Sequence, residues 1–70
     1  MPRLPGISHL RAVKAFKRAG FRIAREERHI TITDGKRIIT IPRKDPINSF
    51  TMAGIIGDAG LSVEEFKRFL

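Results

Sequence analysis

The sequence predicts an α+β domain of order αβββα, in which a three-stranded antiparallel sheet packs on helices. Three observations predict it: apolar residues recur every three to four positions over 9–19, the period falls to two over 21–42, and helical signals return in two short stretches after residue 49. With 70 residues, 41% of them hydrophobic, the chain can build one core. We therefore expect a single domain over 7–70 behind a flexible lead-in at 1–6.

The first helix is expected from His9 to Ala19. Ser8 suits the N-cap because its hydroxyl can accept a free N–H of the first turn, and Gly20 ends the helix. The residues expected on the buried side share an apolar character and helical spacing: Leu10, Ala12, Val13, Phe16 and Ala19. Basic residues occupy the other side: Arg11, Lys14, Lys17 and Arg18.

The strongest local signal is Asp34-Gly35, which is typical of a two-residue type I′ hairpin turn. Such a turn would produce these pairs: Thr33 with Lys36, Thr31 with Ile38, Ile30 with Ile39, and His29 with Thr40. A second turn at Glu26-Glu27 would place Ala24 beside His29 and Arg22 beside Thr31. Both hairpins turn the same residues inward, namely Phe21, Ile23, Ile30 and Ile32. We therefore expect His29 on a polar, basic outer face of the sheet.

Prolines predict a loop over 42–50, followed by a short helix started by Ser49 or Thr51. Three apolar residues of this helix should face inward: Met52, Ile55 and Ile56. Gly54 and Gly57 each weaken a helix by about 1 kcal/mol relative to alanine, so we expect another element to pack closely against them.

The last helix is predicted by a capping box between Ser62 and Glu65, in which each residue's side chain accepts from the backbone of the other. Gly60 separates it from the helix before. Its apolar residues are Phe66, Phe69 and Leu70.

The charge balance points to an anionic partner. Fourteen Lys and Arg against seven Asp and Glu give a net charge of +7, which favours a nucleic acid or an acidic protein. No cysteine is present, and the two histidines and the carboxylates are not clustered, so we expect neither a metal nor a cofactor. No apolar run is long enough for a membrane span and the start lacks a secretory signal, so we expect a cytoplasmic protein.

His29 has two interpretations. Histidine titrates near neutral pH and can act as a general acid or base, as ribonuclease chemistry requires. A lone exposed histidine on a strand is more often an ordinary surface residue. His9, in the first turn of the first helix, is a weaker candidate.

Eight basic residues are candidate RNA ligands. Arg22, Arg28 and Lys36 lie on or beside the expected outer face, and Arg11, Lys14 and Arg18 align along one side of the first helix. Arg43 and Lys44 lie in the loop after the third strand. Basic residues on the outside of an amphipathic helix are usually simple solvent contacts, but their presence together with a basic sheet face favours phosphate binding. The five phenylalanines fit core positions, and Tyr and Trp are absent, so contacts to backbone and 2′-OH are favoured over base stacking.

The predicted αβββ order followed by helix is the double-stranded-RNA-binding-like arrangement. The stretches RAVKAFKRAGFRI, DGKRIITIP and AGIIGDAGLSVEEF, with one histidine at the start of the second strand, resemble the HicA/YcfA-like mRNA interferase toxins over nearly all of the chain after residue 6. The resemblance implies the toxin of a type II toxin–antitoxin pair, a metal-independent endoribonuclease that cuts mRNA and is silenced by a HicB-like antitoxin. It also implies that His29 is catalytic.

The chain departs from that family pattern at two places. The small pair that usually precedes the histidine is replaced by Glu26-Glu27-Arg28, and the second histidine common after the third strand is replaced by Arg43-Lys44. A single histidine serves as base or acid at one time, so water or a cation such as Lys36 would protonate the leaving group. Two alternatives therefore stay open: a non-catalytic RNA-binding module, and a protein whose basic face is occupied mainly by an acidic antitoxin.

Overall fold

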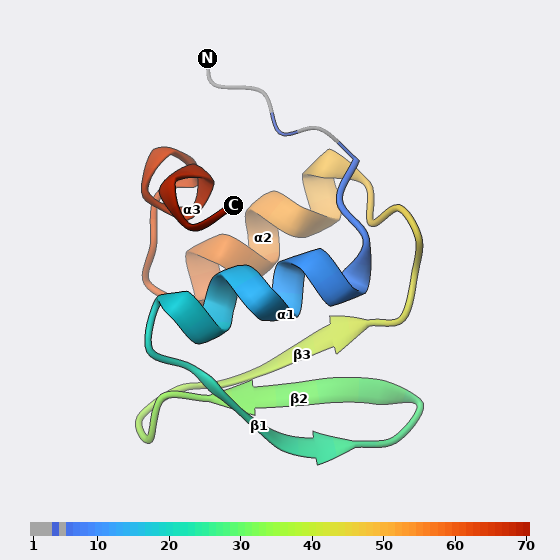
Figure 1. Cartoon of the computed structure of the whole chain (residues 1–70), viewed down its shortest axis with the longest axis vertical. Coiled ribbons are helices and arrows are strands. Elements are labelled where there is room, and N and C mark those ends of the chain that lie inside the picture. Colours follow the sequence, from blue (N-terminus) through green and yellow to red (C-terminus); the bar gives the residue numbers. More distant parts are fainter. Residues whose placement is uncertain (1–3, 5) are drawn as a thin grey trace.

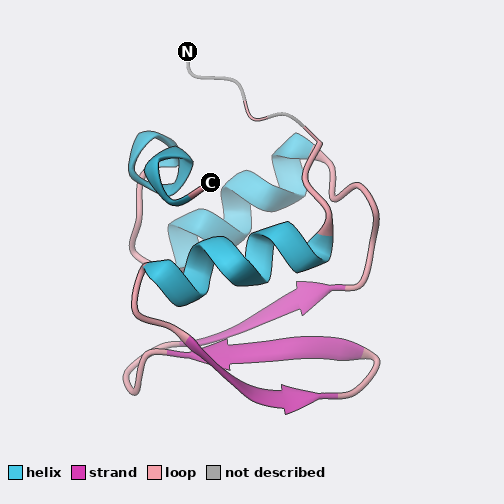
Figure 2. Cartoon of the chain, viewed as in Figure 1, coloured by secondary structure: helices cyan, strands magenta, loops and turns pink. Residues whose placement is uncertain are grey.

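The computed structural model describes Leu4 and residues 6–70. Its elements follow the predicted order, with the final helical stretch broken in two (Figure 2): α1 (His9–Arg18), β1 (Arg22–Glu26), β2 (His29–Thr33), β3 (Ile38–Pro42), α2 (Ser49–Asp58) and α3 (Val63–Phe69). The predicted α+β fold is thus confirmed. Of the expected lead-in, residues 1–3 and 5 lie outside the described residues, whereas Leu4 packs against the core.

The molecule has a sheet layer and a helical layer. The three strands form an antiparallel sheet in the order β1-β2-β3, and α1 and α2 lie along one face of it (Figure 1). The third helix, α3, packs against α1 and α2. We call the face of the sheet that meets the helices the inner face, and the opposite one the outer face. No helix of the described chain covers the outer face (Figure 1).

The core forms where the inner face meets the helices. Four isoleucines of β2 and β3 fill the inner face, each at most 3% exposed: Ile30, Ile32, Ile39 and Ile41. Phe16 of α1 lies at the centre, with its ring 4.9 Å from that of Phe66 and 5.6 Å from that of Phe21. Fully burying a side chain of this size stabilises the fold by about 1.5–3 kcal/mol, so this cluster is a main source of stability.

Helix α1 begins as predicted, because the Ser8 hydroxyl accepts the N–H of Arg11 at 3.2 Å. The prediction for Leu10 is wrong: it is 64% exposed. The buried residues of α1 are Ala12, Val13, Ala15 and Phe16, which centre the apolar stripe on Ala12 and Phe16. At 100° per residue, Leu10 falls on the opposite side of the helix.

The β2–β3 hairpin has a longer loop than the predicted two-residue turn. Thr33 pairs with Ile38, Thr31 with Thr40, Ile30 with Ile41 and His29 with Pro42. Asp34 does not adopt a positive φ, so no type I′ turn forms. The four-residue loop 34–37 shifts the register by two, which preserves the predicted faces because side chains alternate with period two.

The β1–β2 pairing also differs from the prediction. Ala24 does not face His29, and Arg22 pairs with Thr33 rather than Thr31. The register shifts between Ile23 and Arg25, so Ala24 is the extra residue of a β-bulge. The predicted inward residues of both strands are nevertheless confirmed: Phe21, Ile30 and Ile32 are buried and Ile23 is half-buried against the core.

Helix α2 buries Met52, Ile55 and Ile56 as predicted. Its N-cap is Asn48, whose side-chain oxygen accepts the N–H of Thr51 at 2.8 Å, instead of Ser49 or Thr51. The expected close packing at Gly54 and Gly57 is wrong, because a Cβ at either position would meet nothing within 4 Å.

Phe50 contradicts the prediction that the five phenylalanines occupy core positions. It is 88% exposed on the first turn of α2 and takes no part in the core.

Helix α3 follows its prediction closely. The Ser62 hydroxyl accepts the N–H of Glu65, and the Glu65 carboxylate accepts the N–H of Ser62, both at 3.1 Å. Phe66 is fully buried below this capping box.

Candidate functional site

The outer face carries the candidate site. Alternation along β2 turns His29, Thr31 and Thr33 to this face, while Ile30 and Ile32 point to the core. The neighbouring strands add further outer residues: Arg22, Ala24 and Arg25 from β1, and Ile38, Thr40 and Pro42 from β3. The structure therefore places His29 where the sequence predicted it, exposed on a polar face. Among the described residues, its ring makes no hydrogen bond.

Arg43 lies at the same end of the sheet as His29. Its Nε donates a hydrogen bond of 2.9 Å to the carbonyl oxygen of Glu27 in the β1–β2 turn. Arg43 follows the last residue of β3, and β2 lies between β3 and β1. The Arg43 side chain therefore crosses the end of β2, where His29 is the first residue. This hydrogen bond fixes a guanidinium group at the His29 end of the sheet.

Two more arginines accompany His29. Arg28 precedes it directly and is exposed, and Arg25 lies opposite Thr31, diagonally across from His29. Arg25 approaches Glu27 only loosely, with 3.7 Å between its Nε and Oε1, and both side chains are well exposed. Exposed pairs of this kind are weak, so the Arg25 guanidinium is available to a ligand. We call Arg25, Arg28, His29 and Arg43 the arginine–histidine cluster.

Lys36 lies at the opposite end of the sheet. It belongs to the loop 34–37, which follows Thr33, and the four residue steps from His29 to Thr33 span about 14 Å. Lys36 is therefore too far from His29 to pass a proton to a group bound there, and the prediction that it assists His29 directly is wrong. Arg22 pairs with Thr33 and lies at that end as well. The outer face thus carries positive charge at both ends.

Asp34 shapes the loop that holds Lys36. Its Oδ1 accepts the backbone N–H groups of Lys36 and Arg37 at 2.9 and 2.7 Å. The hydrogen bond from the Arg37 N–H, followed by that from Lys36, holds the pKa of the Asp34 carboxyl below its ordinary value. The Thr33 hydroxyl donates to the Arg37 carbonyl at 2.7 Å and accepts the Gly35 N–H at 3.0 Å. These side-chain bonds favour a four-residue loop over the two-residue turn.

The basic residues of α1 do not share the outer face, because α1 packs on the inner face. Arg18 donates through its Nη1 to the carbonyl oxygen of Phe69 at 2.7 Å, and so joins the end of α1 to the end of α3. Arg11 and Lys14 are exposed on the helical layer. The eight predicted ligands therefore form separate groups: Arg28 and Arg43 lie beside His29, Arg22 and Lys36 lie at the far end, three residues lie on α1, and Lys44 lies in the loop after β3.

His9 has a structural role that the sequence did not reveal. Its Nδ1 lies 2.9 Å from Asp45 Oδ1, and its backbone N–H donates to the same oxygen at 3.0 Å. These contacts, led by the backbone hydrogen bond, lower the pKa of the Asp45 carboxyl. The His9 N–H also bonds the Lys44 carbonyl. His9 therefore fastens the loop after β3 to the start of α1, and Lys44 lies in that loop with an exposed side chain.

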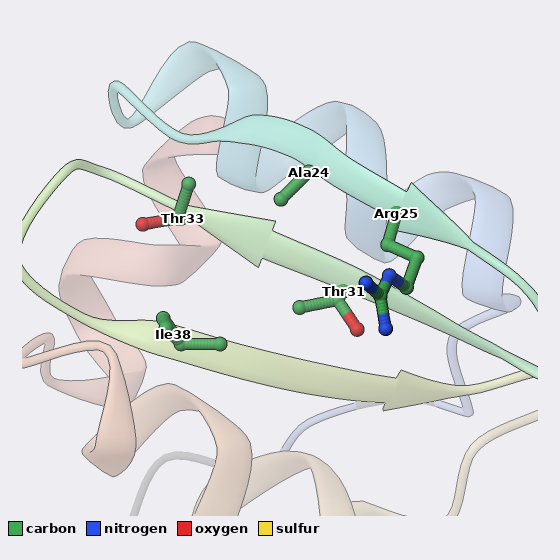
Figure 3. Close-up of a pocket in the computed structure, with 5 residues that line it drawn as sticks. All are labelled: Ala24, Arg25, Thr31, Thr33 and Ile38. Atoms are coloured by element: carbon green, nitrogen blue, oxygen red, sulfur yellow. The ribbon is translucent and has the colours of Figure 1, made fainter.

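Sequence reasoning missed Arg25 as a residue of the outer face, and it placed Ile38 on that face without giving it a role. Together with Ala24, Thr31 and Thr33 they line an open hollow of about 360 Å³ (Figure 3). Period-two alternation is the signal for Ile38, because it places this residue outward. The same alternation places Arg25 on the inward side with Phe21 and Ile23, and only the bulge at Ala24 turns Arg25 outward. The hollow itself depends on the bulge at Ala24, for which the sequence carries no marker.

Among residues 4 and 6–70, no group of three or more His, Cys, Asp or Glu side chains is arranged to hold a metal ion. The helices of this part of the chain are all too short or too polar to cross a bilayer. Comparisons with protein-family models, with curated proteins and with solved structures find no match to this chain. We therefore infer the function from the residues of the outer face.

Proposed function

We propose that this chain is a metal-independent endoribonuclease that cuts mRNA at the arginine–histidine cluster. The observation that carries the proposal is the position of His29, which is exposed on the sheet face that no helix of the described chain covers, at the end of the sheet where Arg43 is bonded to the Glu27 carbonyl. A general acid–base group next to fixed positive charge is what RNA cleavage requires. The resemblance to HicA/YcfA-like toxins supports the same residue.

The chemistry follows from the substrate, because RNA carries its own nucleophile. His29 removes the proton of a ribose 2′-OH, and the 2′-oxygen attacks the adjacent phosphorus. The bond from phosphorus to the 5′-oxygen of the next nucleotide breaks. The products are a 2′,3′-cyclic phosphate and a 5′-hydroxyl end. Arg28 and Arg43 stabilise the negative charge that develops on the phosphoryl oxygens.

The leaving 5′-oxygen takes its proton from water in this mechanism. Arg28 and Arg43 do not supply it, because a guanidinium group stays protonated throughout the accessible pH range. Lys36 is at the other end of the sheet, and His9 is held by Asp45. With one acid–base residue in place, we expect slow turnover, which suits a toxin that acts by accumulating cuts.

The proposal includes a HicB-like antitoxin as protein partner. The net charge of +7 favours an acidic surface, and the outer face, which no helix of the described chain covers, offers the area for it. A partner seated there would exclude RNA from His29. Inhibition and substrate binding would then compete for the same arginines.

The test uses purified wild-type protein and His29→Ala with end-labelled RNA in EDTA. We expect wild type to produce fragments with 2′,3′-cyclic phosphate ends, and His29→Ala to cut at least about 100-fold more slowly. His29 is exposed, so the free energy of unfolding should change by no more than about 0.5 kcal/mol. Thr40→Ala, on the same face, is the matched control and should cut like wild type. Equal cleavage by His29→Ala would overturn the catalytic role.

One observation favours a second function, that of a non-catalytic RNA-binding module. His29 has no second acid–base side chain positioned beside it by a hydrogen bond among the described residues, and Glu26-Glu27-Arg28 occupies the place of the small pair. The same assay separates the two functions. RNA binding of equal strength by wild type and His29→Ala, with no cleavage by either, supports the module.

A further inference from the structure

The hollow on the outer face has a structural cause. The bulge adds Ala24 to β1 at the point where Arg25 pairs with Thr31, and alanine fills little of the space that the bulge opens. The hydroxyl of Thr33 is bonded to the Arg37 carbonyl and the Gly35 N–H, both in the loop. The register shift between β1 and β2 thus brings two consecutive residues of β1, Ala24 and Arg25, to the lining of the hollow.

The walls of the hollow combine apolar surface with two polar groups. Ala24 and Ile38 supply the apolar part, and Ile38 is 77% exposed although isoleucine is a core residue elsewhere in this sheet. The Thr31 hydroxyl and the Arg25 guanidinium supply the polar part, and the Arg25 side chain runs from β1 toward Thr31 over the sheet (Figure 3). The volume of the hollow, about 360 Å³, is within the range of small-ligand sites.

The hollow lies between the two cationic ends of the outer face. Thr31 is two residues from His29 on the same face, about 7 Å along the strand. Arg28 and Arg43 lie on one side of the hollow, and Arg22 and Lys36 on the other. A polyanion that follows the outer face therefore contacts positive charge, then the hollow, then positive charge again.

We propose that the hollow binds a nucleobase of single-stranded RNA, belonging to a nucleotide next to the linkage at His29. This inference rests on the proposed function. Ile38 and Ala24 contact the ring of the base, the planar Arg25 guanidinium stacks on it, and the Thr31 hydroxyl meets its edge. Bases in single strands are splayed out and stack on guanidinium planes, whereas bases in a duplex are not free to enter such a hollow. Base recognition here needs no aromatic side chain.

The experiment measures the affinity for uncleavable octamers that carry the same phosphates with and without bases. The probes are 2′-fluoro RNA octamers of A, C, G or U and a fully abasic octamer, each with a fluorescent end label. We expect wild type to bind at least one base-bearing octamer roughly fivefold or more tightly than the abasic one. Ile38→Ala, Thr31→Val and Arg25→Lys should each reduce this ratio, with unchanged affinity for the abasic octamer. Arg25→Lys keeps the charge and removes only the planar group.

Thr40→Val is the matched control, because Thr40 faces outward beside Thr31 but does not line the hollow. It should retain the wild-type ratio. Equal affinity of wild type for base-bearing and abasic octamers overturns the proposal, and so does a wild-type ratio in all three hollow variants. The comparison of base-bearing with abasic octamers uses the wild-type protein alone, so its result does not depend on whether a variant folds.

The two proposals fail in different ways. Absence of cleavage by wild type, with the base preference intact, overturns the ribonuclease and leaves the hollow as the base site of a binding module. Cleavage that depends on His29, with no base preference, overturns the hollow and leaves the ribonuclease.

Discussion

The two faces of the sheet differ in what determines their residues. On the inner face, Ile30 and Ile41 pair across β2 and β3 and are almost completely buried, so the fold depends on them. On the outer face, Thr31 and Thr40 form the next pair, and the fold makes little use of either side chain. One step along β2 therefore exchanges a residue that stabilises the protein for one that is available to a ligand. The difference teaches that stability and the proposed RNA binding can be altered separately.

The prediction with the largest expected effect compares the free energy of unfolding after substitution of two neighbouring residues of β2, one on each face. Ile30→Ala should lower the free energy of unfolding by about 2–5 kcal/mol, because it removes buried methyl groups and leaves a cavity. Thr31→Ala, one residue away, should change it by about 0.5 kcal/mol or less. Urea unfolding followed by circular dichroism measures both. Similar reductions for the two variants would mean that the faces are not distinct.

The sequence predicted correctly those features of the fold that depend on neighbouring residues. Period-two alternation placed Ile30 and Ile32 inward, and the capping box at Ser62 placed α3, since both signals depend on neighbouring residues alone. The register was missed because Asp34 and Thr33 bond the loop backbone with their side chains and lengthen the turn. The exposure of Leu10 was missed because Leu10 and Val13 have the spacing of one buried helix side. In the fold, the buried side of α1 is centred on Ala12 and Phe16 instead.

The site was predictable to a similar extent. Alternation along β2 is enough to place His29 outward, and this survives a register shift of two. Which arginines join it was not predictable, because Arg43 is held at the His29 end of the sheet by a bond to a carbonyl sixteen residues away in sequence. The hollow requires the bulge at Ala24, which arises from the pairing of two whole strands.

A second prediction compares the basic residues near His29 with a basic residue of the helical layer. Arg28→Ala and Arg43→Ala should each weaken RNA binding and reduce the slope of log affinity against log salt by about 0.7, the value for each phosphate of a single strand that the protein no longer neutralises. Arg11→Ala, on the helical layer, is the matched control and should leave the slope unchanged. Fluorescence anisotropy at several salt concentrations measures the slopes. An equal reduction in all three variants would show that only net charge matters.

The smallest expected effect concerns the loop that joins β2 to β3 at the far end of the sheet. The pKa of Asp34 is lowered in the folded state, so its contribution to stability is present above about pH 4, the ordinary pKa, and is lost as the pH falls through the lower folded value. Asp34→Asn keeps the acceptor oxygen but cannot titrate, so its stability should fall less between about pH 5 and pH 2. Unfolding midpoints across this range measure the difference. Identical pH profiles for the two proteins would contradict a role for the charged carboxylate.

The β-bulge at Ala24 has a consequence for how such a protein changes over generations. Because Ala24 lines the hollow at the bulge and is itself exposed, replacing this one small residue by a larger one would fill the space without disturbing the buried isoleucines. Lineages could thereby exchange one preferred ligand for another through single substitutions, while selection for folding acts on the opposite side of the same strands.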